Sequence, residues 1–403
     1  MTTATEQLQA TRAKINWDQI FKIASSIRKQ PCTSDGNEFL GGCNIVYCIA
    51  FVDGTRWAIR LPYDEMRSAV EATVTTMQYG HSTVPDIPIA TVHAWSDSED
   101  GGGVGTPYML LDWIEGRTLE WNASFPPPAD RGKVLAQLAQ YSAELLAHTM
   151  VQSTTQSALA WMLRRIDSRL TRIFTGDLPS FDPIDCLIYR AMAKEKYHVP
   201  SLDTFPFPLM HTDLSQMNIL VDNNFNIKGI LDWDDWACRL PLQCAVMCPA
   251  MISAGNNLPH DTLLHKDRLA FIDHFSSAIS SSDLHDDIVV HLLSIMANDE
   301  LQVFQSSIKS KGVYAYWVTK YSIRSTQWIK AASRALDKFI LAHPEMASWS
   351  EVLSSDKFSL LEIRIGGPEF AYVPEPLRGP NLQGSAVRSK VLLSVLTYAI
   401  KKI

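Results

Sequence analysis

The chain has 403 residues, long enough for one large two-lobed enzyme or for two ordinary domains. With 46% hydrophobic and 20% charged residues, its composition is that of an ordinary globular protein. The formal net charge of −7 offers no basic surface for a phosphate backbone, which argues against a nucleic-acid partner.

Signals for disulfides, secretion and membrane insertion are missing from the sequence. The sequence has seven cysteines, an odd number, and no Cys-x-x-Cys motif. We therefore expect reduced thiols and neither a disulfide framework nor a zinc site. Residues 1–14 are polar and lack the apolar stretch of a signal peptide, and no run of about 18 apolar residues predicts a transmembrane helix. We therefore expect a cytoplasmic protein with no membrane partner. The sequence gives no indication of the oligomeric state.

Residues 1–115 are predicted to form a strand-rich lobe. The elements expected there are helices at 16–29 and 66–79 and strands within 39–60, 87–95 and 108–114. Two β-rich runs flank Asp53-Gly54, a dipeptide typical of hairpin turns. The acidic, glycine-rich run 96–106 predicts a flexible hairpin tip, because a phosphate-binding loop would need a strand before it and a helix after it.

Residues 116–403 are predicted to form a larger, mainly helical lobe. The expected elements are helices at 129–150, 154–175 and 182–196, a mostly helical stretch at 260–342, a loop at 366–384 and a last helix at 386–401. Residues 209–235 are expected to form short strands and loops within this lobe. A strand-rich lobe followed by a helical lobe with a small hairpin predicts an α+β, two-lobed, protein-kinase-like fold.

Several side chains of the helical lobe are predicted to fill its core. His148 continues the apolar face of the helix at 129–150, so we expect a core histidine and not a catalyst. Four large aromatic residues could line a pocket for an acceptor substrate, but we expect them in the core as well. They are Trp161, Tyr316, Trp317 and Trp328.

Polar residues with a characteristic spacing occur in one short part of the chain. It begins with His211-Thr212-Asp213-Leu214-Ser215-Gln216-Met217-Asn218, followed by an apolar run. Asp213 and Asn218 have the His-x-Asp-x-x-x-x-Asn spacing of a kinase catalytic loop. Asp232 follows in Gly229-Ile230-Leu231-Asp232-Trp233, at the end of the next expected strand. A two-strand unit with a polar turn at 222–224 would bring the loop and Asp232 together.

Phosphoryl transfer requires positioning and neutralisation of phosphate charge more than covalent chemistry. One carboxylate must lie near the acceptor hydroxyl, and Mg²⁺ needs only a few hard oxygen ligands from the protein. We predict Asp213 and His211 as catalytic residues and Asn218 and Asp232 as magnesium ligands. Considered singly, Asp232 could equally be a turn or helix cap, and His211 a hydrogen-bonded core residue.

The motifs His-x-Asp-Leu-x-x-x-Asn-Ile-Leu and Gly-x-x-Asp-Trp together resemble the aminoglycoside phosphotransferase and choline-kinase-like family. They are most similar to its fungal-type members, which have Asp-Trp where protein kinases have Asp-Phe-Gly. The resemblance covers roughly residues 35–250 and implies a small-molecule kinase that uses ATP and Mg²⁺. In that family Asp213 would be the catalytic aspartate, and Asn218 and Asp232 would bind magnesium.

The resemblance also implies a nucleotide site in the strand-rich lobe. Residues 39–44 are similar to the loop that covers the nucleotide, and 108–116 to the hinge that holds adenine through backbone groups. Residues 57–60 are similar to the third strand, whose cation pairs with a glutamate on the next helix and with the nucleotide phosphates. The implied cofactor-binding residues are Gly41, Gly42, Asn44, Arg60, Glu71, Asp112 and Ile114.

Some positions depart from the family pattern. Arg60 stands where kinases have lysine, and its planar guanidinium has a different reach; an ordinary exposed strand arginine is the alternative interpretation. Met217 replaces a small residue before the catalytic-loop asparagine, and Ser215-Gln216 replaces a commoner His-Pro pair. A bulky Met217 could alter the loop or line an unusual acceptor pocket. Asp234 and Asp235 could contact a cationic substrate, assist at magnesium or form a solvated turn.

Three functions are therefore open. The first is an ATP-dependent phosphotransferase acting on a hydroxyl, or less favourably an amine, of a small molecule. The second is a pseudokinase that holds nucleotide without transferring phosphate. The third is a kinase-fold protein diverted to nucleotide-independent chemistry or ligand binding in specialised metabolism. No Ala-Pro-Glu follows Asp232, which disfavours a protein substrate. The motifs identify neither the acceptor nor the choice between ATP and GTP.

Overall fold

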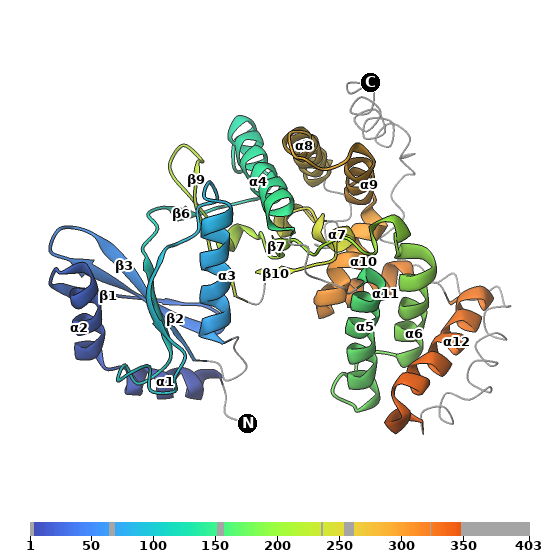
Figure 1. The fold of residues 1–403 in the computed structure, drawn as a ribbon, viewed down its shortest axis with the longest axis horizontal. Coiled ribbons are helices and arrows are strands. Elements are labelled where there is room, and N and C mark those ends of the chain that lie inside the picture. Colours follow the sequence, from blue (N-terminus) through green and yellow to red (C-terminus); the bar gives the residue numbers. More distant parts are fainter. Residues whose placement is uncertain are drawn as a thin grey trace. The chain divides into compact units, whose positions relative to one another are not determined.

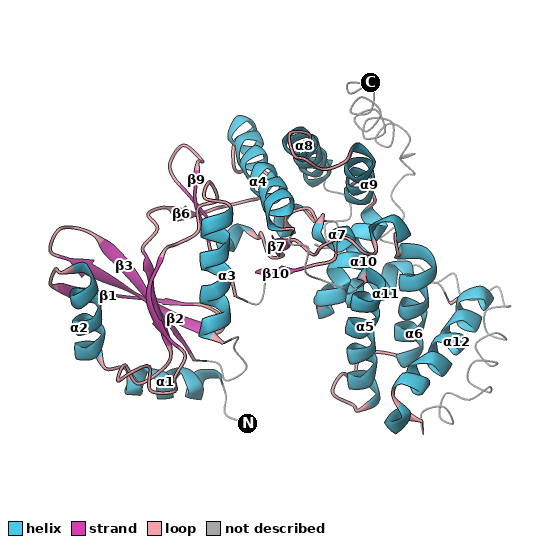
Figure 2. Ribbon diagram, in the orientation of Figure 1, coloured by secondary structure: helices cyan, strands magenta, loops and turns pink. Residues whose placement is uncertain are grey.

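A computed structural model shows an α+β chain with a five-stranded sheet near the N-terminus and mainly helices in the C-terminal part (Figures 1 and 2). The predicted fold class is confirmed. The structure describes residues 4–63, 69–150, 157–234, 237–253, 262–322 and 324–347. The loop predicted at 366–384 and the helix predicted at 386–401 lie outside these residues. No helix in the described ranges is both long and apolar enough to cross a membrane.

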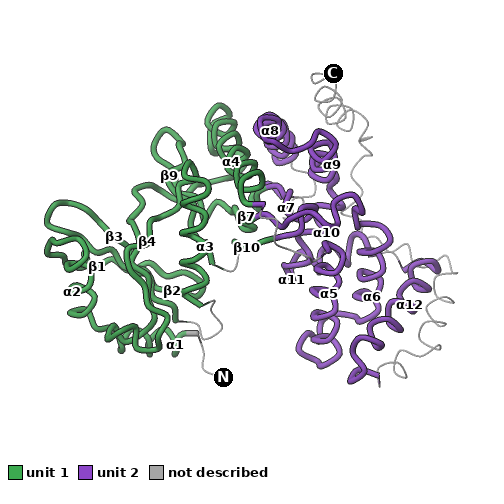
Figure 3. Tube along the Cα trace, viewed as in Figure 1, with its two compact units in different colours: residues 1–149, 209–239, 249–251 green, residues 150–208, 240–248, 252–403 purple. Residues whose placement is uncertain are grey.

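The chain divides into two compact units (Figure 3). The first consists of Met1–Thr149, Leu209–Arg239 and Pro249–Met251, and the remaining residues form the second. The segment that carries the predicted catalytic loop therefore belongs to the same unit as the N-terminal strands. The lobe boundary predicted between residues 115 and 116 stays a prediction.

The five-stranded sheet of the first unit is antiparallel throughout, in the order β1-β2-β3-β5-β4. Its strands are β1 Cys32–Leu40, β2 Asn44–Phe51, β3 Arg56–Pro62, β4 Val92–Ser96 and β5 Tyr108–Asp112. The predicted hairpin between β2 and β3 is confirmed: Gly54 has φ +85°, which glycine adopts at no steric cost, and the Phe51 N–H bonds to the Thr55 carbonyl at 2.9 Å. Strand β1 was not predicted.

Helices cover both faces of this sheet, as the alternation of side chains along β5 shows. Tyr108 and Leu110 pack in a cluster with Ile20 of α2 (Trp17–Arg28), whereas Met109 packs with Val70 and Val74 of α3 (Val70–Thr83). Helix α2 matches the helix predicted at 16–29. Helix α3 begins at Val70, and residues 66–68 of the helix predicted at 66–79 lie outside the described part. Helix α1 (Ala4–Lys14) was not predicted.

Short strands complete the first unit beside the long helix α4 (Pro128–Thr149). They form a three-stranded sheet in the order β6-β8-β9 and a β7-β10 pair. Their bounds are β6 Arg117–Thr118, β7 Leu209–His211, β8 Ile219–Val221, β9 Ile227–Ile230 and β10 Ala237–Arg239. The Leu209 N–H donates to the hydroxyl of Thr149 at 2.7 Å, which joins the end of α4 to β7.

The second unit is helical in its described part, as predicted. Its α-helices are α5 Ala158–Phe174, α6 Pro183–Met192, α7 Leu242–Ala245, α8 Thr262–Ile279, α9 Asp286–Met296, α10 Asp299–Lys309, α11 Lys311–Tyr321 and α12 Thr326–Ala342. Side-chain caps define several starts: Asp182 accepts from the Ile184 N–H at 2.8 Å and Asn298 from the Leu301 N–H at 3.1 Å. Buried Arg169 donates to the last carbonyls of α10.

Of the two predictions about core side chains, the one for His148 was wrong and the one for the four aromatic residues held only for Trp317. His148 is exposed, because α4 turns its buried face away at its last turn, where Thr149 is buried instead. Of the four aromatic residues, Trp317 is fully buried against Tyr189, but Trp161, Tyr316 and Trp328 are only half-buried. Helical periodicity located the helices but did not fix which residue ends each buried face.

Candidate active site

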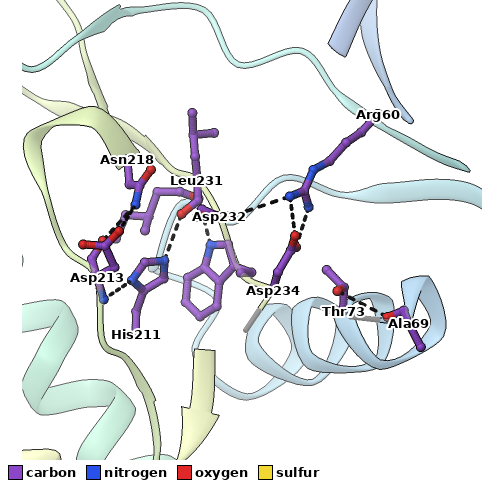
Figure 4. A network of polar contacts seen from close by, with 11 residues as sticks. Arg60, Ala69, Thr73, His211, Asp213, Asn218, Leu231, Asp232 and Asp234 are labelled. Carbon is purple, nitrogen blue, oxygen red and sulfur yellow. Dashed lines mark hydrogen bonds and ion pairs between the residues drawn. The ribbon is translucent and has the colours of Figure 1, made fainter. Parts of the chain in front are cut away.

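The candidate site lies in the first unit, where the loop between β7 and β8 meets the end of β9 (Figure 4). Antiparallel pairing of β8 with β9 sets Ile219 opposite Ile230. The Leu231 N–H then donates to the Asn218 carbonyl at 2.8 Å. This pairing brings together the two motifs that the sequence separates by the turn after Val221.

His211 joins these two segments through both ring nitrogens. Its Nε2 lies 2.9 Å from the Leu231 carbonyl oxygen, and its Nδ1 lies 3.3 Å from the Asp213 backbone nitrogen. A carbonyl can only accept and an N–H can only donate, so Nε2 carries the proton and Nδ1 accepts. The ring is 5% exposed and packs edge-on against Trp233. Through these contacts His211 holds the loop to the end of β9, and the catalytic role predicted for it stays a prediction.

The side chains of Asp213 and Asn218 are held against each other. The Asn218 amide Nδ2 donates to the Asp213 backbone carbonyl and to its Oδ2, each at 3.0 Å. Because the amide group turns its NH₂ toward Asp213, its oxygen Oδ1 is the atom left to face a cation. Met217, one residue earlier, is 67% exposed in the short turn Gln216–Asn218.

Asp232 adopts a left-handed backbone conformation, with φ +64°. Aspartate is among the few residues that tolerate this region, and such conformations are common at functional sites. The following Trp233 is buried, and its indole Nε1 donates to the Ile230 carbonyl at 2.8 Å. The Asp-Trp pair thus combines an anchored indole with a carboxylate held directly after β9.

Arg60 on β3 reaches the carboxylates beyond β9. Both of its terminal nitrogens donate to Asp234, one to each carboxylate oxygen, and Nη2 also lies 3.4 Å from Oδ1 of Asp232. The predicted partner was Glu71, but no ion pair joins Arg60 to Glu71 within the described residues. Glu71 is exposed in the first turn of α3, while Asp234 offers two oxygens that match the guanidinium fork.

The predicted nucleotide-covering loop connects β1 to β2. The Gly41 N–H bonds to the Asn44 carbonyl at 2.9 Å and closes the turn. Tyr63 was not singled out from the sequence, yet its hydroxyl lies 2.9 Å from the Gly41 carbonyl and 2.7 Å from the Gly42 carbonyl. Both carbonyls face Tyr63. In a trans peptide the C=O and N–H point in opposite directions, so the N–H groups of Gly42 and Cys43 point away from Tyr63.

The predicted hinge at the end of β5 is tied into the sheet by Asp112. Its backbone N–H donates to the Thr91 carbonyl, and its side chain accepts from the Thr91 N–H at 3.1 Å and meets Nε2 of His93 at 2.7 Å. Burial alone would raise the pKa of Asp112, but these two partners hold it below its ordinary value. An adenine base would therefore need backbone groups other than the Asp112 N–H, for example those at Ile114.

The glycine-rich run connects the antiparallel strands β4 and β5, so the predicted hairpin is confirmed, and its flexibility stays a prediction. Gly101, Gly102, Gly103 and Gly105 all have positive φ, and a Cβ at Gly105 would lie 1.9 Å from the Lys14 carbonyl oxygen. The Val104 carbonyl accepts from the Asn16 N–H at 2.8 Å. These contacts give the turn a structural role at the end of α1.

A magnesium ion needs hard oxygen ligands, and the residues at this site offer them. In the described ranges, no group of three or more His, Cys, Asp and Glu side chains could hold a metal ion. A nucleotide-bound Mg²⁺ needs fewer, because it takes one or two protein ligands and completes its shell with phosphates and water. The Asn218 oxygen and the Asp232 carboxylate fit this donor chemistry. Asp235 lies outside the described residues.

Comparisons with known proteins agree with this architecture. A crystal structure from Ralstonia eutropha, described as an aminoglycoside phosphotransferase, is 15% identical over 79% of this chain and 95% of its own, with a TM-score of 0.50. Two further structures match more weakly. Plasmodium vivax ethanolamine kinase is 14% identical over 75% of this chain and 81% of its own, with a TM-score of 0.43. Macrolide 2'-phosphotransferase from Brachybacterium faecium is 14% identical over 79% of this chain and 97% of its own, with a TM-score of 0.44. A search of curated proteins finds no match. The family model of the phosphotransferase enzyme family matches residues 52–259, just over half of the chain, and the chain belongs to that family.

Proposed function

We propose that the chain is a small-molecule kinase that transfers the γ-phosphoryl group of ATP to a hydroxyl, or less favourably an amine, of a metabolite. The observation that carries this proposal is the network in which His211 and Asn218 fix Asp213 beside the end of β9. Membership of the phosphotransferase enzyme family supports the reaction class. ATP as the nucleotide, a small-molecule acceptor and a cytoplasmic location are further expectations that rest on the sequence.

The residues have distinct tasks in this proposal. Asp213 accepts a hydrogen bond from the acceptor hydroxyl and takes its proton as the new oxygen–phosphorus bond forms and the bond to ADP breaks. Asn218 orients Asp213 through its NH₂ group. The Asn218 oxygen and Asp232 would hold Mg²⁺, which neutralises phosphate charge when bound. Arg60 directs positive charge toward the phosphates.

The test is phosphoryl transfer to a panel of hydroxyl- and amine-bearing small molecules in the presence of ATP and Mg²⁺. Mass spectrometry would detect the gain of one phosphoryl group, and hydrolysis of ATP by water would be followed in parallel. Asp213→Asn should abolish transfer while the protein stays folded. Asp86→Asn is a matched control, since Asp86 is exposed and outside the network. Transfer that survives Asp213→Asn would refute the assignment.

A pseudokinase is the second candidate, and one observation favours it. Arg60 is held by two carboxylates, Asp234 and Asp232, where an active kinase would direct its cation to the nucleotide phosphates. Such a protein would bind nucleotide without turning it over. Mg²⁺-dependent binding of ATP with no transfer to any acceptor and no hydrolysis would support this alternative over the first.

A further inference from the structure

The ion pair between Arg60 and Asp234 is a long-range polar contact of the candidate site. It joins β3 to the segment after β9, which are 174 residues apart. The Arg60 side chain is 12% exposed and that of Asp234 is 19% exposed, so water screens this pair far less than a surface pair. The Ala237 N–H donates to the Asp234 backbone carbonyl at 3.2 Å, which fixes the backbone of the acidic partner.

The contacts of Arg60 distinguish Asp234 from Asp232 and from the expected partner Glu71. Asp234 meets Nη1 and Nη2 with its two oxygens, the fork-to-fork arrangement that an arginine makes best. Arg60 approaches only one oxygen of Asp232, at 3.4 Å, longer than a normal charge-assisted hydrogen bond. Glu71 is exposed at the start of α3, where its charge favours the helix N-terminus.

Arg60 pairs with Asp234 and not with the expected Glu71 because it is an arginine and not a lysine. A lysine presents one compact ammonium group, which a single carboxylate oxygen can hold from several directions. An arginine presents a rigid plane, and only a carboxylate lying in that plane holds both terminal nitrogens. Arg60 and Asp234 therefore make sense as a matched pair, in which the arginine depends on the position of Asp234.

We propose that Asp234 is the positioning residue for Arg60 and does for this chain what we had expected of Glu71. It holds the guanidinium plane at the end of β3, so that the cation meets the nucleotide phosphates in one orientation. Asp234 acts through Arg60 and touches no reacting atom. This inference rests on the proposed function, because it requires that the site binds a nucleotide.

The experiment compares the binding of two probes, Mg²⁺-ATP and adenosine, by calorimetry. Asp234→Asn keeps the size of the side chain but presents an NH₂ group to the guanidinium. We expect it to weaken Mg²⁺-ATP binding about tenfold, as for other residues that orient a functional group, and to leave adenosine binding unchanged. Asp86→Asn, at an exposed aspartate outside the network, is the matched control and should change neither. Arg60→Gln should weaken Mg²⁺-ATP binding, and adding Asp234→Asn to it should cause no further loss.

Each outcome separates the inference from the proposed function. If the wild type binds neither ATP nor GTP, the proposed function fails and this inference fails with it. If the wild type binds ATP and Asp234→Asn binds it equally well, only the inference fails. Tighter binding by Asp234→Asn would also overturn it, because the pair would then hold Arg60 away from the phosphates. A purely structural ion pair would lower the unfolding temperature of Asp234→Asn without changing the ratio of ATP to adenosine affinity.

Discussion

Replacing His211 by phenylalanine should separate its packing from its two hydrogen bonds. Phenylalanine keeps a ring that can pack edge-on against Trp233, but it can neither donate to the Leu231 carbonyl nor accept from the Asp213 N–H. Both lost partners are backbone groups, one on each of the segments that form the candidate site. The substitution therefore tests whether this histidine holds the catalytic loop to the end of β9.

The expected size follows from these two bonds. A hydrogen bond between neutral groups contributes about 1 kcal/mol net, so His211→Phe should lower the free energy of unfolding by about 2 kcal/mol. The loss should not be much greater, since Asp213 and Leu231 are partly exposed and water can reach the groups left behind. Turnover should fall more steeply, roughly a hundredfold, because a displacement of about 1 Å in a catalytic group can cost that much.

Two further variants divide the effect between the two bonds. In His211→Gln, the glutamine Nε2 can donate to the Leu231 carbonyl as the histidine does. In His211→Asn, the asparagine Oδ1 can accept from the Asp213 N–H. Each should recover about 1 kcal/mol of stability relative to His211→Phe. Only His211→Asn should recover turnover, since its bond goes directly to the residue that carries Asp213.

Urea unfolding and ATP turnover measured on the same preparations would check these expectations. The reasoning would be refuted if His211→Phe unfolded at the wild-type urea concentration and kept wild-type turnover. It would also be refuted if His211→Gln recovered turnover and His211→Asn did not. Either result would mean that the two bonds do not position Asp213.

Three other substitutions test the structure around the site. Gly229→Ala would place a Cβ 2.6 Å from the side chain of Ile114, so it should destabilise the protein by about 1–3 kcal/mol, and Ile114→Val should restore part of the loss in a thermal unfolding assay. Asp112→Asn should destabilise the protein at neutral pH but not in acid. Hydrogen bonds from Thr91 and His93 hold the pKa of Asp112 below its ordinary value, so the ionised carboxylate contributes stability above about pH 4 that is lost as the pH falls through the folded pKa. In a urea series the difference from wild type should vanish at low pH; a difference that persists there would contradict the role of the carboxylate charge. Arg169→Met should lower the free energy of unfolding in urea by about 3 kcal/mol or more, because it removes the donor to the buried carbonyls at the end of α10. A loss below about 1 kcal/mol would show that other groups or water satisfy these carbonyls.

The parts that could be predicted from the sequence are those set by local chemistry. The β2–β3 hairpin follows from Asp53-Gly54, because the turn needs a residue that accepts a positive φ. The proximity of Asp213, Asn218 and Asp232 follows from two short strands joined by a polar turn. Both are consequences of residues near each other in the chain. The catalytic and metal-binding roles given to these residues stay predictions.

The parts that could not be predicted depend on contacts between distant residues. The family pattern predicted Glu71 as the partner of Arg60, but Arg60 meets Asp234, which is 174 residues away in the sequence. Tyr63 carries no motif, and its contact with the glycine loop appears only once β2 and β3 pair. His148 continues a helical pattern, but in the last turn of α4 it is exposed while Thr149 is buried. In each case the tertiary arrangement selects among options that the local pattern leaves open.

The most direct test of the proposed phosphoryl-transfer site is calorimetric binding of ATP, with and without Mg²⁺, to the wild type and to Asp232→Asn. We predict that the wild type binds ATP in a Mg²⁺-dependent manner and that Asp232→Asn weakens this binding by about tenfold or more, because the metal loses a carboxylate ligand. Failure of the folded wild type to bind either ATP or GTP would contradict the proposed function. It would be contradicted equally if binding were unaffected both by removal of Mg²⁺ and by Asp232→Asn.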